Sequence, residues 1–136
     1  MKARDVMTRA PRTVEPETTI LTALALMRDG GIRHLVVVDD AGRLAGVVSN
    51  RDYRKVLDST DAAGVIHGIR DVKIKDIMTP GRSLVTAGPD TPLLDVARLM
   101  VGKKVGCVPV VDDVRRPIGI LTQADVIEKL LSLHSA

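Results

Sequence analysis

The sequence predicts a mixed α/β fold made of two copies of one strand–helix–strand–strand–helix unit, with small sheets and flanking helices. A repeat is the first observation: residues 46–52, GVVSNRD, return as residues 119–125, GILTQAD, 73 positions later. The same shift superposes residues 37–40 on residues 110–113. Within each copy, apolar residues change from helical spacing to short continuous runs, so helices and strands alternate.

Local signals define the elements of the first copy in order. Pro16 with Thr18 or Thr19 predicts a helix start, and Gly30-Gly31 ends that helix. Val-rich runs on both sides of a turn predict a hairpin. The elements are an extended piece at 13–14, a helix that begins near 20, strands at 34–39 and 44–48, and a helix opened by Ser49.

The second copy repeats this order. It has an extended piece at 85–86, a helix led by Pro92, strands at 108–111 and 118–121, and a helix from Thr122. Residues 6–8 recur at 77–79 with a shift of only 71, so two residues are inserted before the first helix of copy two. We therefore expect domains at 1–60 and 77–136, joined by a segment at 61–76 whose Val65, Ile66 and Ile69 pack on the pair.

Composition limits the class of protein. With 136 residues, each copy lies near the lower limit for independent stability, so each is expected to need the other. Trp and Phe are absent and Tyr53 is the only aromatic residue, which predicts an aliphatic core. The net charge of +3 is scattered, the lone Cys107 fits a reducing compartment, and no membrane span or signal peptide is apparent, so we expect a cytoplasmic protein.

The repeated phrase carries the chemistry. Its glycine lets a ligand approach the backbone, and the hydroxyl of Ser49 or Thr122 lies where a strand becomes a helix, beside N–H groups that favour anions. Three residues later, the carboxylate of Asp52 or Asp125 can accept two hydrogen bonds from the vicinal hydroxyls of a ribose. Together these groups suit a nucleotide.

The same residues also match a helix-capping box, in which the hydroxyl and the acid satisfy backbone amides at the helix start. One such box alone would be structural. Two boxes in equivalent places, each at the end of an apolar strand, favour the ligand role. The two functions can coexist, because a capping acid can turn to a ribose.

These motifs resemble the cystathionine-β-synthase (CBS) domain, here as a tandem pair. The resemblance rests on Met-Thr, Thr-Val, the Thr-led helix, the HLVVVD and CVPVVD strands and the two closing motifs. It implies two units packed about a pseudo-twofold, a disc-shaped homodimer, and clefts for AMP, ADP or ATP, with S-adenosylmethionine or NAD(H) as less favoured ligands. The residues that it implies for ligand binding are Asp52 and Asp125 for ribose, Ser49 and Thr122 near ribose and phosphate, and Thr13, Val14, His34, Leu35, Val36, Val85, Thr86, Cys107, Val108 and Pro109 for adenine.

The two copies differ at some of these positions. Val36 stands where copy two has Pro109, so the first cleft is expected to have another shape. Arg51 is replaced by Ala124, and we expect the cleft reached by Arg51, Arg33 and His34 to hold the ligand of higher charge. The alternative is that these arginines are solvated surface. Without Trp or Phe, the base must lie between aliphatic side chains, which predicts roughly micromolar affinity.

Other chemistry has weak support. His34, Cys107, His67 and His134 lack the spacing of a zinc site, so we expect no metal. A lone strand cysteine is usually a buried hydrophobe rather than a nucleophile, and no acid–base pair suggests catalysis, so we expect no enzyme.

Two functional hypotheses follow. The first is a non-enzymatic regulatory sensor of adenine nucleotides that acts on a partner in trans, because no enzyme, transporter or DNA-binding module is attached. The alternative is a structural dimerisation module with empty clefts. Nucleic-acid binding is a weaker option without a supporting motif. The sequence leaves open the preferred adenylate, the number of filled clefts, the partner, and whether the dimer is parallel or antiparallel.

Overall fold

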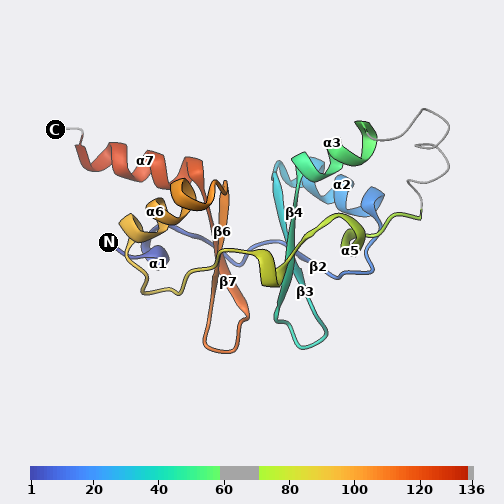
Figure 1. The fold of residues 1–136 in the computed structure, drawn as a ribbon, viewed down its shortest axis with the longest axis horizontal. Coiled ribbons are helices and arrows are strands. Elements are labelled where there is room, and N and C mark those ends of the chain that lie inside the picture. The colour runs from blue at the N-terminus through green and yellow to red at the C-terminus, as the bar shows by residue number, and fades with distance from the viewer. Residues whose placement is uncertain (59–70, 135–136) are drawn as a thin grey trace. The chain divides into compact units, whose positions relative to one another are not determined.

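The computed structural model describes residues 1–58 and 71–134, which form two compact units (Figure 1). The first unit consists of residues 12–84 and carries the first copy of the repeat. The second unit combines residues 1–11 with residues 85–136 and carries the second copy. The predicted contribution of Val65, Ile66 and Ile69 lies outside the described residues.

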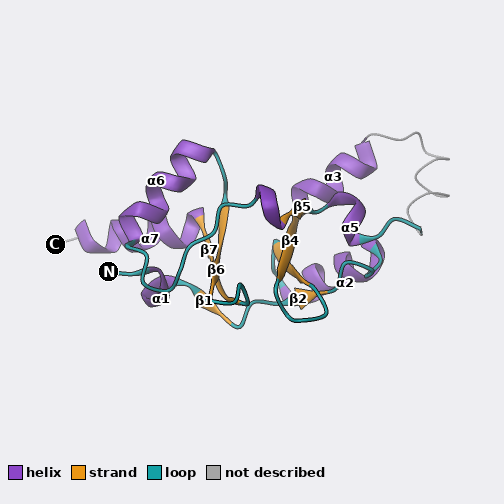
Figure 2. Ribbon diagram, turned by 60° about the horizontal axis from the view of Figure 1, so that its bottom comes forward, coloured by secondary structure: helices purple, strands orange, loops and turns teal. Residues whose placement is uncertain are grey.

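The first unit has a four-stranded sheet with α2, α3 and α5 on one side (Figure 2). The strand order is β2-β3-β4-β5, in which β2 runs parallel to β3 and the other pairs are antiparallel. The strands are β2 (Thr13–Val14), β3 (His34–Val38), β4 (Leu44–Ser49) and β5 (Thr79–Pro80), and the helices are α2 (Ile20–Gly30), α3 (Asn50–Asp58), α5 (Ile74–Ile77) and the 3-10 turn η1 (Gly81–Ser83).

The second unit repeats this plan. Its sheet has the order β1-β7-β6, and Ala87 adds a single parallel bridge to β6. The elements are α1 (Ala3–Val6), β1 (Thr8–Arg9), α6 (Leu93–Lys103), β6 (Cys107–Val111), β7 (Pro117–Thr122) and α7 (Gln123–His134). The mixed α/β fold with small sheets and flanking helices is therefore confirmed.

The segments that lead into the two copies are exchanged between the units. β1, from the start of copy one, pairs with β7 of copy two, whereas β5, from the start of copy two, pairs with β4 of copy one. The compact units thus divide the chain differently from the repeat, whose boundaries at 1–60, 61–76 and 77–136 stay a prediction about the copies. The two inserted residues of copy two fall where η1 follows β5.

Local signals from the sequence account for the ends of α2. The side-chain oxygen of Thr19 accepts a hydrogen bond from the amide of Thr22 at 3.2 Å, which caps the helix start. Gly31 ends the helix in the left-handed conformation, with φ 62°, where glycine is least strained. The predicted helix start and end are both confirmed.

The prediction of an extended piece at Val85-Thr86 is wrong in its position, because the residue that bridges to β6 is Ala87. In the first unit, the amide of Val36 donates to the carbonyl of Arg12 at 3.1 Å, which begins the β2–β3 ladder. Pro109 stands at the equivalent position of the second unit and has no N–H to donate to Val85. Pairing there starts later, where the amide of Ala87 donates to the carbonyl of Pro109 at 3.0 Å.

Each unit has its own apolar core. In the first unit the core joins α2, α3 and α5 to the sheet and includes Ile20, Leu35, Val48 and Ile74. Tyr53 is buried in it, and its hydroxyl donates to the carbonyl of Ile20 at 2.5 Å. The aliphatic core is therefore confirmed with this one aromatic addition. Within residues 1–58 and 71–134, no helix has the length and apolar character needed to cross a bilayer.

The motif glycines have a packing role that the sequence did not reveal. A Cβ added at Gly46 would stand 2.6 Å from the sulfur of Met78 and 2.7 Å from the carbonyl oxygen of Thr79. At Gly119, a Cβ would overlap the sulfur of Met7. The expectation that these glycines open the backbone to a ligand is wrong, because a methionine from the exchanged leading segment occupies the space.

We expect Gly46→Ala and Gly119→Ala each to lower the free energy of unfolding by about 1–3 kcal/mol, as overpacked cores do. Met7→Ala should relieve most of the cost of Gly119→Ala, because the clashing atoms belong to a side chain. Met78→Ala should relieve less of the cost of Gly46→Ala, because the carbonyl of Thr79 stays in place. Denaturant unfolding of the single and double variants measures this coupling. Additive costs in the Gly119 pair would contradict this packing.

Candidate functional site

The closing motif of the first unit lies at the end of the β3–β4 hairpin away from its turn. His34 and Ser49 are directly paired across the two strands. The amide of Asn50, the first residue of α3, donates to the carbonyl of Arg33 at 3.2 Å, so Arg33 lies beside the helix start. Four predicted residues, Arg33, His34, Ser49 and Asp52, are thereby brought together.

Hydrogen bonds hold the carboxylate of Asp52 at this junction. Its Oδ2 accepts from the amide of Ser49 at 2.8 Å and from the hydroxyl of Ser49 at 3.3 Å. Both side chains are half-buried. The capping interaction expected as the alternative reading is therefore present in this unit.

The second unit has the same arrangement with both halves of the capping box. Oδ2 of Asp125 accepts from the amide of Thr122 at 3.0 Å, and the hydroxyl of Thr122 accepts from the amide of Asp125 at 3.3 Å. In the described part of the chain, no hydrogen bond engages the other carboxylate oxygen, Oδ1, of Asp52 or Asp125. One oxygen of each acid stays available to a ligand while the other caps the helix.

Strand alternation separates the remaining predicted residues of the first unit into two groups. Leu35 and Val14 belong to the core beneath the helices, so only their backbone can meet a ligand. Thr13 pairs with Val36, and His34 pairs with Ser49, on the opposite face of the sheet. Val36 is fully buried, so the side chains that stay accessible on this face are those of Thr13, His34 and Ser49.

The second unit divides in the same way. Val108 is in its core and Val85 packs against that core. Cys107 pairs with Thr122, and Pro109 lies one alternation along on the same face of the sheet. Thr86 lies next to Pro109, because the amide of the following Ala87 donates to the carbonyl of Pro109.

A shallow groove of about 320 Å³ lies on the second unit between α1 and α7. Among the predicted residues, only Asp125 reaches this groove. The lining residues are Asp5, Val6, Asp125, Glu128, Lys129 and Ser132. The groove therefore makes Asp125 accessible but does not gather Cys107, Pro109 or Thr122 around it.

Burial controls the titration of the two equivalent residues next to the acids. Burial lowers the pKa of His34, and the nearby Asp52 partly offsets this effect. Burial raises the pKa of the Cys107 thiol to about 12, with a smaller contribution from the charge of Asp125. Cys107 thus stays protonated at neutral pH, which opposes a nucleophilic role.

The structure also limits the possibility of a metal site. Across residues 1–58 and 71–134, no three His, Cys, Asp or Glu side chains are grouped so that they could hold a metal ion. His67 lies outside the described residues.

Sequence reasoning missed two residues near the motif. Ala87, rather than Val85, makes the backbone bridge to β6. Arg54 lies one turn beyond Arg51 on α3. A strict shift of 73 would have revealed both residues. It aligns Val14 with Ala87, and it shows a change of charge between Arg54 and Ile127.

Comparison with known proteins decides the family. The CBS domain profile matches residues 3–59 and again residues 74–132. The chain belongs to the CBS domain family. It is a tandem CBS pair, and solved structures of other CBS pairs share its fold.

Two of these solved structures contain adenosine compounds. One is CBSX2, an Arabidopsis thaliana protein, in complex with AMP, with a TM-score of 0.82, 31% identity and 98% of each chain covered. Another is the CBS domain pair of protein MJ0100 with 5′-methylthioadenosine and S-adenosyl-L-methionine, with a TM-score of 0.84 and 30% identity over 99% of this chain and 98% of that one.

Curated relatives include both short and long proteins. A CBS domain-containing protein of Dictyostelium discoideum is 30% identical, and the match covers 96% of this chain and 91% of that protein. An inosine-5′-monophosphate dehydrogenase of Methanocaldococcus jannaschii is 32% identical, over 94% of this chain but 23% of the enzyme. The chain spans less than a quarter of the first three curated relatives it matches.

We expect Cys107 to react slowly with a thiol reagent. At pH 8 the native protein should react with Ellman's reagent at least about a hundredfold more slowly than the same protein in guanidinium, where the thiol regains its ordinary pKa. Absorbance at 412 nm follows the reaction, and the single cysteine makes the assignment unique. A native rate within tenfold of the denatured rate would contradict the raised pKa.

Proposed function

We propose that this CBS pair is a non-enzymatic regulatory module that binds an adenosine-containing ligand at its two closing motifs. The observation that carries the proposal is the duplicated acid at the strand–helix junction, with one oxygen held by the cap and the other free of hydrogen bonds within the described residues. The ligands present in CBSX2 and in the MJ0100 pair support this ligand class.

Each predicted residue has a role in this proposal. Oδ1 of Asp52 or Asp125 accepts hydrogen bonds from the ribose hydroxyls, and the hydroxyl of Ser49 or Thr122 lies near ribose and phosphate. The adenine lies on the sheet face away from the helices, against Thr13 and His34 in one unit and against Thr86 and Cys107 in the other. The predicted Val36 and Pro109 are fully buried side chains on that face. AMP, ADP or ATP is the favoured ligand, with S-adenosylmethionine or NAD(H) second.

The ligand changes the activity of a partner only through its unequal affinity for two shapes of the pair. We propose that this partner acts in trans. Relatives of almost the same length as this chain, such as the Dictyostelium discoideum protein, support that part of the proposal. A purely structural module with empty sites is the competing hypothesis, because the capping bonds alone account for the acids.

A first measurement uses the weak near-ultraviolet absorbance of a chain with one Tyr and no Trp. We expect an adenine nucleotide that co-purifies with the protein to dominate the spectrum at 260 nm and to be released by acid. Calorimetric titration with AMP, ATP, S-adenosylmethionine and NADH then measures binding by the emptied protein.

Asp52→Ala and Asp125→Ala should each weaken binding at their own site by about 1.5–3 kcal/mol, the cost of a lost hydrogen bond to a charged group. Asp76→Ala is the matched control, because Asp76 caps α5 in the same way, accepting from the amide of Lys73 at 3.0 Å. All three variants should lose up to about 1 kcal/mol of stability with their cap. Unchanged ligand binding in both Asp52→Ala and Asp125→Ala would refute the ribose assignment.

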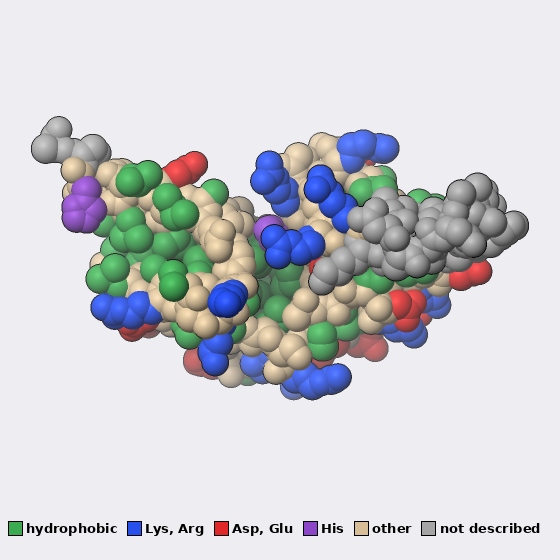
Figure 3. Space-filling model, turned by 45° about the horizontal axis from the view of Figure 1, so that its top comes forward, with side chains coloured by type: hydrophobic (Ala, Val, Ile, Leu, Met, Phe, Trp, Pro, Cys, Tyr) green, Lys and Arg blue, Asp and Glu red, His purple; other side chains and the backbone are tan. Residues whose placement is uncertain are grey.

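We also propose that the pair forms a homodimer through α6 and α7 of the second unit. Large apolar side chains on these helices are solvent-exposed, including Val101 at 79% and Leu131 at 65%, and Figure 3 shows hydrophobic side chains gathered over this unit. The equivalents of Val101 and Ile127 in the first unit are Arg28 and Arg54. An apolar surface of this kind is stabilised by a second apolar surface.

Val101→Arg and Ile127→Arg should convert the dimer to a monomer in sedimentation equilibrium. Each variant introduces the residue that the other copy carries at the same position, so the fold is expected to tolerate it. Lys104→Ala, an exposed change just after α6, is the control and should leave the dimer intact. A monomeric natural protein, or a dimer that persists in both arginine variants, would overturn this interface.

A further inference from the structure

The two copies differ most in charge where their motifs are otherwise alike. Arg33, Arg51 and Arg54 of the first unit have Gly106, Ala124 and Ile127 as their equivalents in the second unit. The bond from the strand-end amide to the acid and the hairpin register are equivalent in both units, whereas the hydroxyl of Ser49 donates to its acid and that of Thr122 accepts from an amide. The second unit is therefore an internal reference in which the site is built without these three positive charges.

The backbone of all three arginines lies at the start of α3 or within its first two turns. The backbone of Arg33 is fixed there by the hydrogen bond from Asn50, and its charge contributes to the lowered pKa of His34. Arg51 and Arg54 are three residues apart on α3, so they share one face of the helix. All three side chains are exposed. Figure 3 shows Lys and Arg side chains gathered near this helix start.

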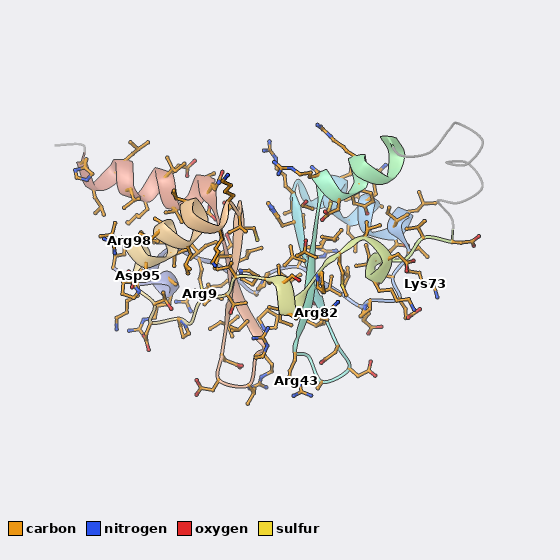
Figure 4. The ribbon with its side chains drawn as sticks, viewed as in Figure 1. Arg9, Arg43, Lys73, Arg82, Asp95 and Arg98 are labelled. Atoms are coloured by element: carbon orange, nitrogen blue, oxygen red, sulfur yellow. The ribbon has the colours of Figure 1, made fainter. Side chains whose placement is uncertain are left out.

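Salt bridges engage two other arginines of this unit, Arg28 and Arg43, whereas none is formed by Arg12 or Arg82 in the described part of the chain. Among the described side chains, which leave out residues 55–58, no carboxylate forms a salt bridge with Arg33, Arg51 or Arg54. By contrast, Nε of Arg43 lies 3.8 Å from Oδ2 of Asp39 at the opposite end of the hairpin (Figure 4). The nearest acid to the trio by sequence is Asp52, and one of its oxygens is already used by the cap.

We propose that the first unit selects a polyphosphorylated adenylate, ADP or ATP, and that Arg33, Arg51 and Arg54 bind the phosphates beyond the first one. The second unit then selects an adenosyl ligand of little or no net negative charge. This inference rests on the proposed function, because it assumes that Asp52 holds the ribose. It adds the charge of the ligand and the residues that recognise it.

The chemistry favours a phosphate chain over a single charged group. A guanidinium presents a planar fork of donors that matches phosphate oxygens, and three forks near one helix start can bind successive phosphates. The amides at the start of α3 add partial positive charge on the same side. In the second unit the groove beside Asp125 is lined by Asp5, Glu128 and Lys129, so it has no surplus of positive charge.

The experiment isolates one site at a time. In an Asp125→Ala background, which is expected to weaken the second site about ten- to a hundredfold, ATP and AMP are titrated without added magnesium. We expect ATP to bind at least about tenfold more tightly than AMP. Arg51→Ala and Arg54→Ala should each lower the affinity for ATP by about three- to tenfold. The same variants should weaken AMP binding less than about threefold, because AMP lacks the outer phosphates. Arg43→Ala, a loss of the same charge in the same unit, should change neither affinity.

The reverse change tests the second unit. In an Asp52→Ala background, Gly106→Arg with Ala124→Arg should raise the ratio of ATP to AMP affinity by about three- to tenfold. Rising salt should weaken ATP binding more in the first unit than in the natural second unit, because salt screens the interaction between exposed arginines and phosphates.

The outcomes separate this inference from the proposed function. If neither nucleotide binds either unit, the proposed function fails. If both units bind adenylates with the same ATP to AMP ratio, or if the arginine variants leave that ratio unchanged, only the charge selection is overturned. Inorganic tripolyphosphate is the last probe: binding as tight as that of ATP would overturn selection of an adenylate, whereas weaker binding supports it.

Discussion

The hydrogen bond from the amide of Ser49 or Thr122 to the following aspartate is the interaction on which the rest of each unit depends. It joins the last residue of a strand to the first turn of a helix, so the helix must begin as soon as the strand ends. The same bond fixes the carboxylate beside the hydroxyl. The fold therefore uses one oxygen of this side chain, and the proposed ligand would use the other.

The exchange of leading segments makes the two units interdependent in the chain. Each sheet is completed by a strand from the other copy. A methionine from that same exchanged segment occupies the space beside each motif glycine. A unit of about 60–70 residues is marginal alone, and here neither copy carries its own edge strand. The mutual need of the copies expected from their size thus has a specific structural cause.

Local patterns predicted most of the fold, since caps, glycine stops and Val-rich runs act over a few residues. The start of α2 at Thr19 and its end at Gly31 are examples. The exchange could not be predicted, because the pairing of β1 with β7 joins residues more than 100 positions apart and has no local signal. The role of Gly46 was missed for the same reason. The candidate ligand residues were chosen by motif, and strand alternation then showed that Leu35 and Val108 can offer only backbone.

The duplicated design also limits where the copies can diverge. Residues that hold the cap, contact the motif glycines or face the core must stay compatible with folding in both units, so buried differences such as Tyr53 against Val126 stay apolar, whereas exposed positions also change in charge. Arg28 against Val101 and Arg54 against Ile127 are exposed in both units, and they change the surface from charged to apolar without changing the helices. A single backbone plan can therefore give one copy the charge suited to an anionic ligand and the other the apolar surface suited to association. Under the proposed function, ligand binding and assembly would influence each other only if both depended on which of two shapes the pair adopts.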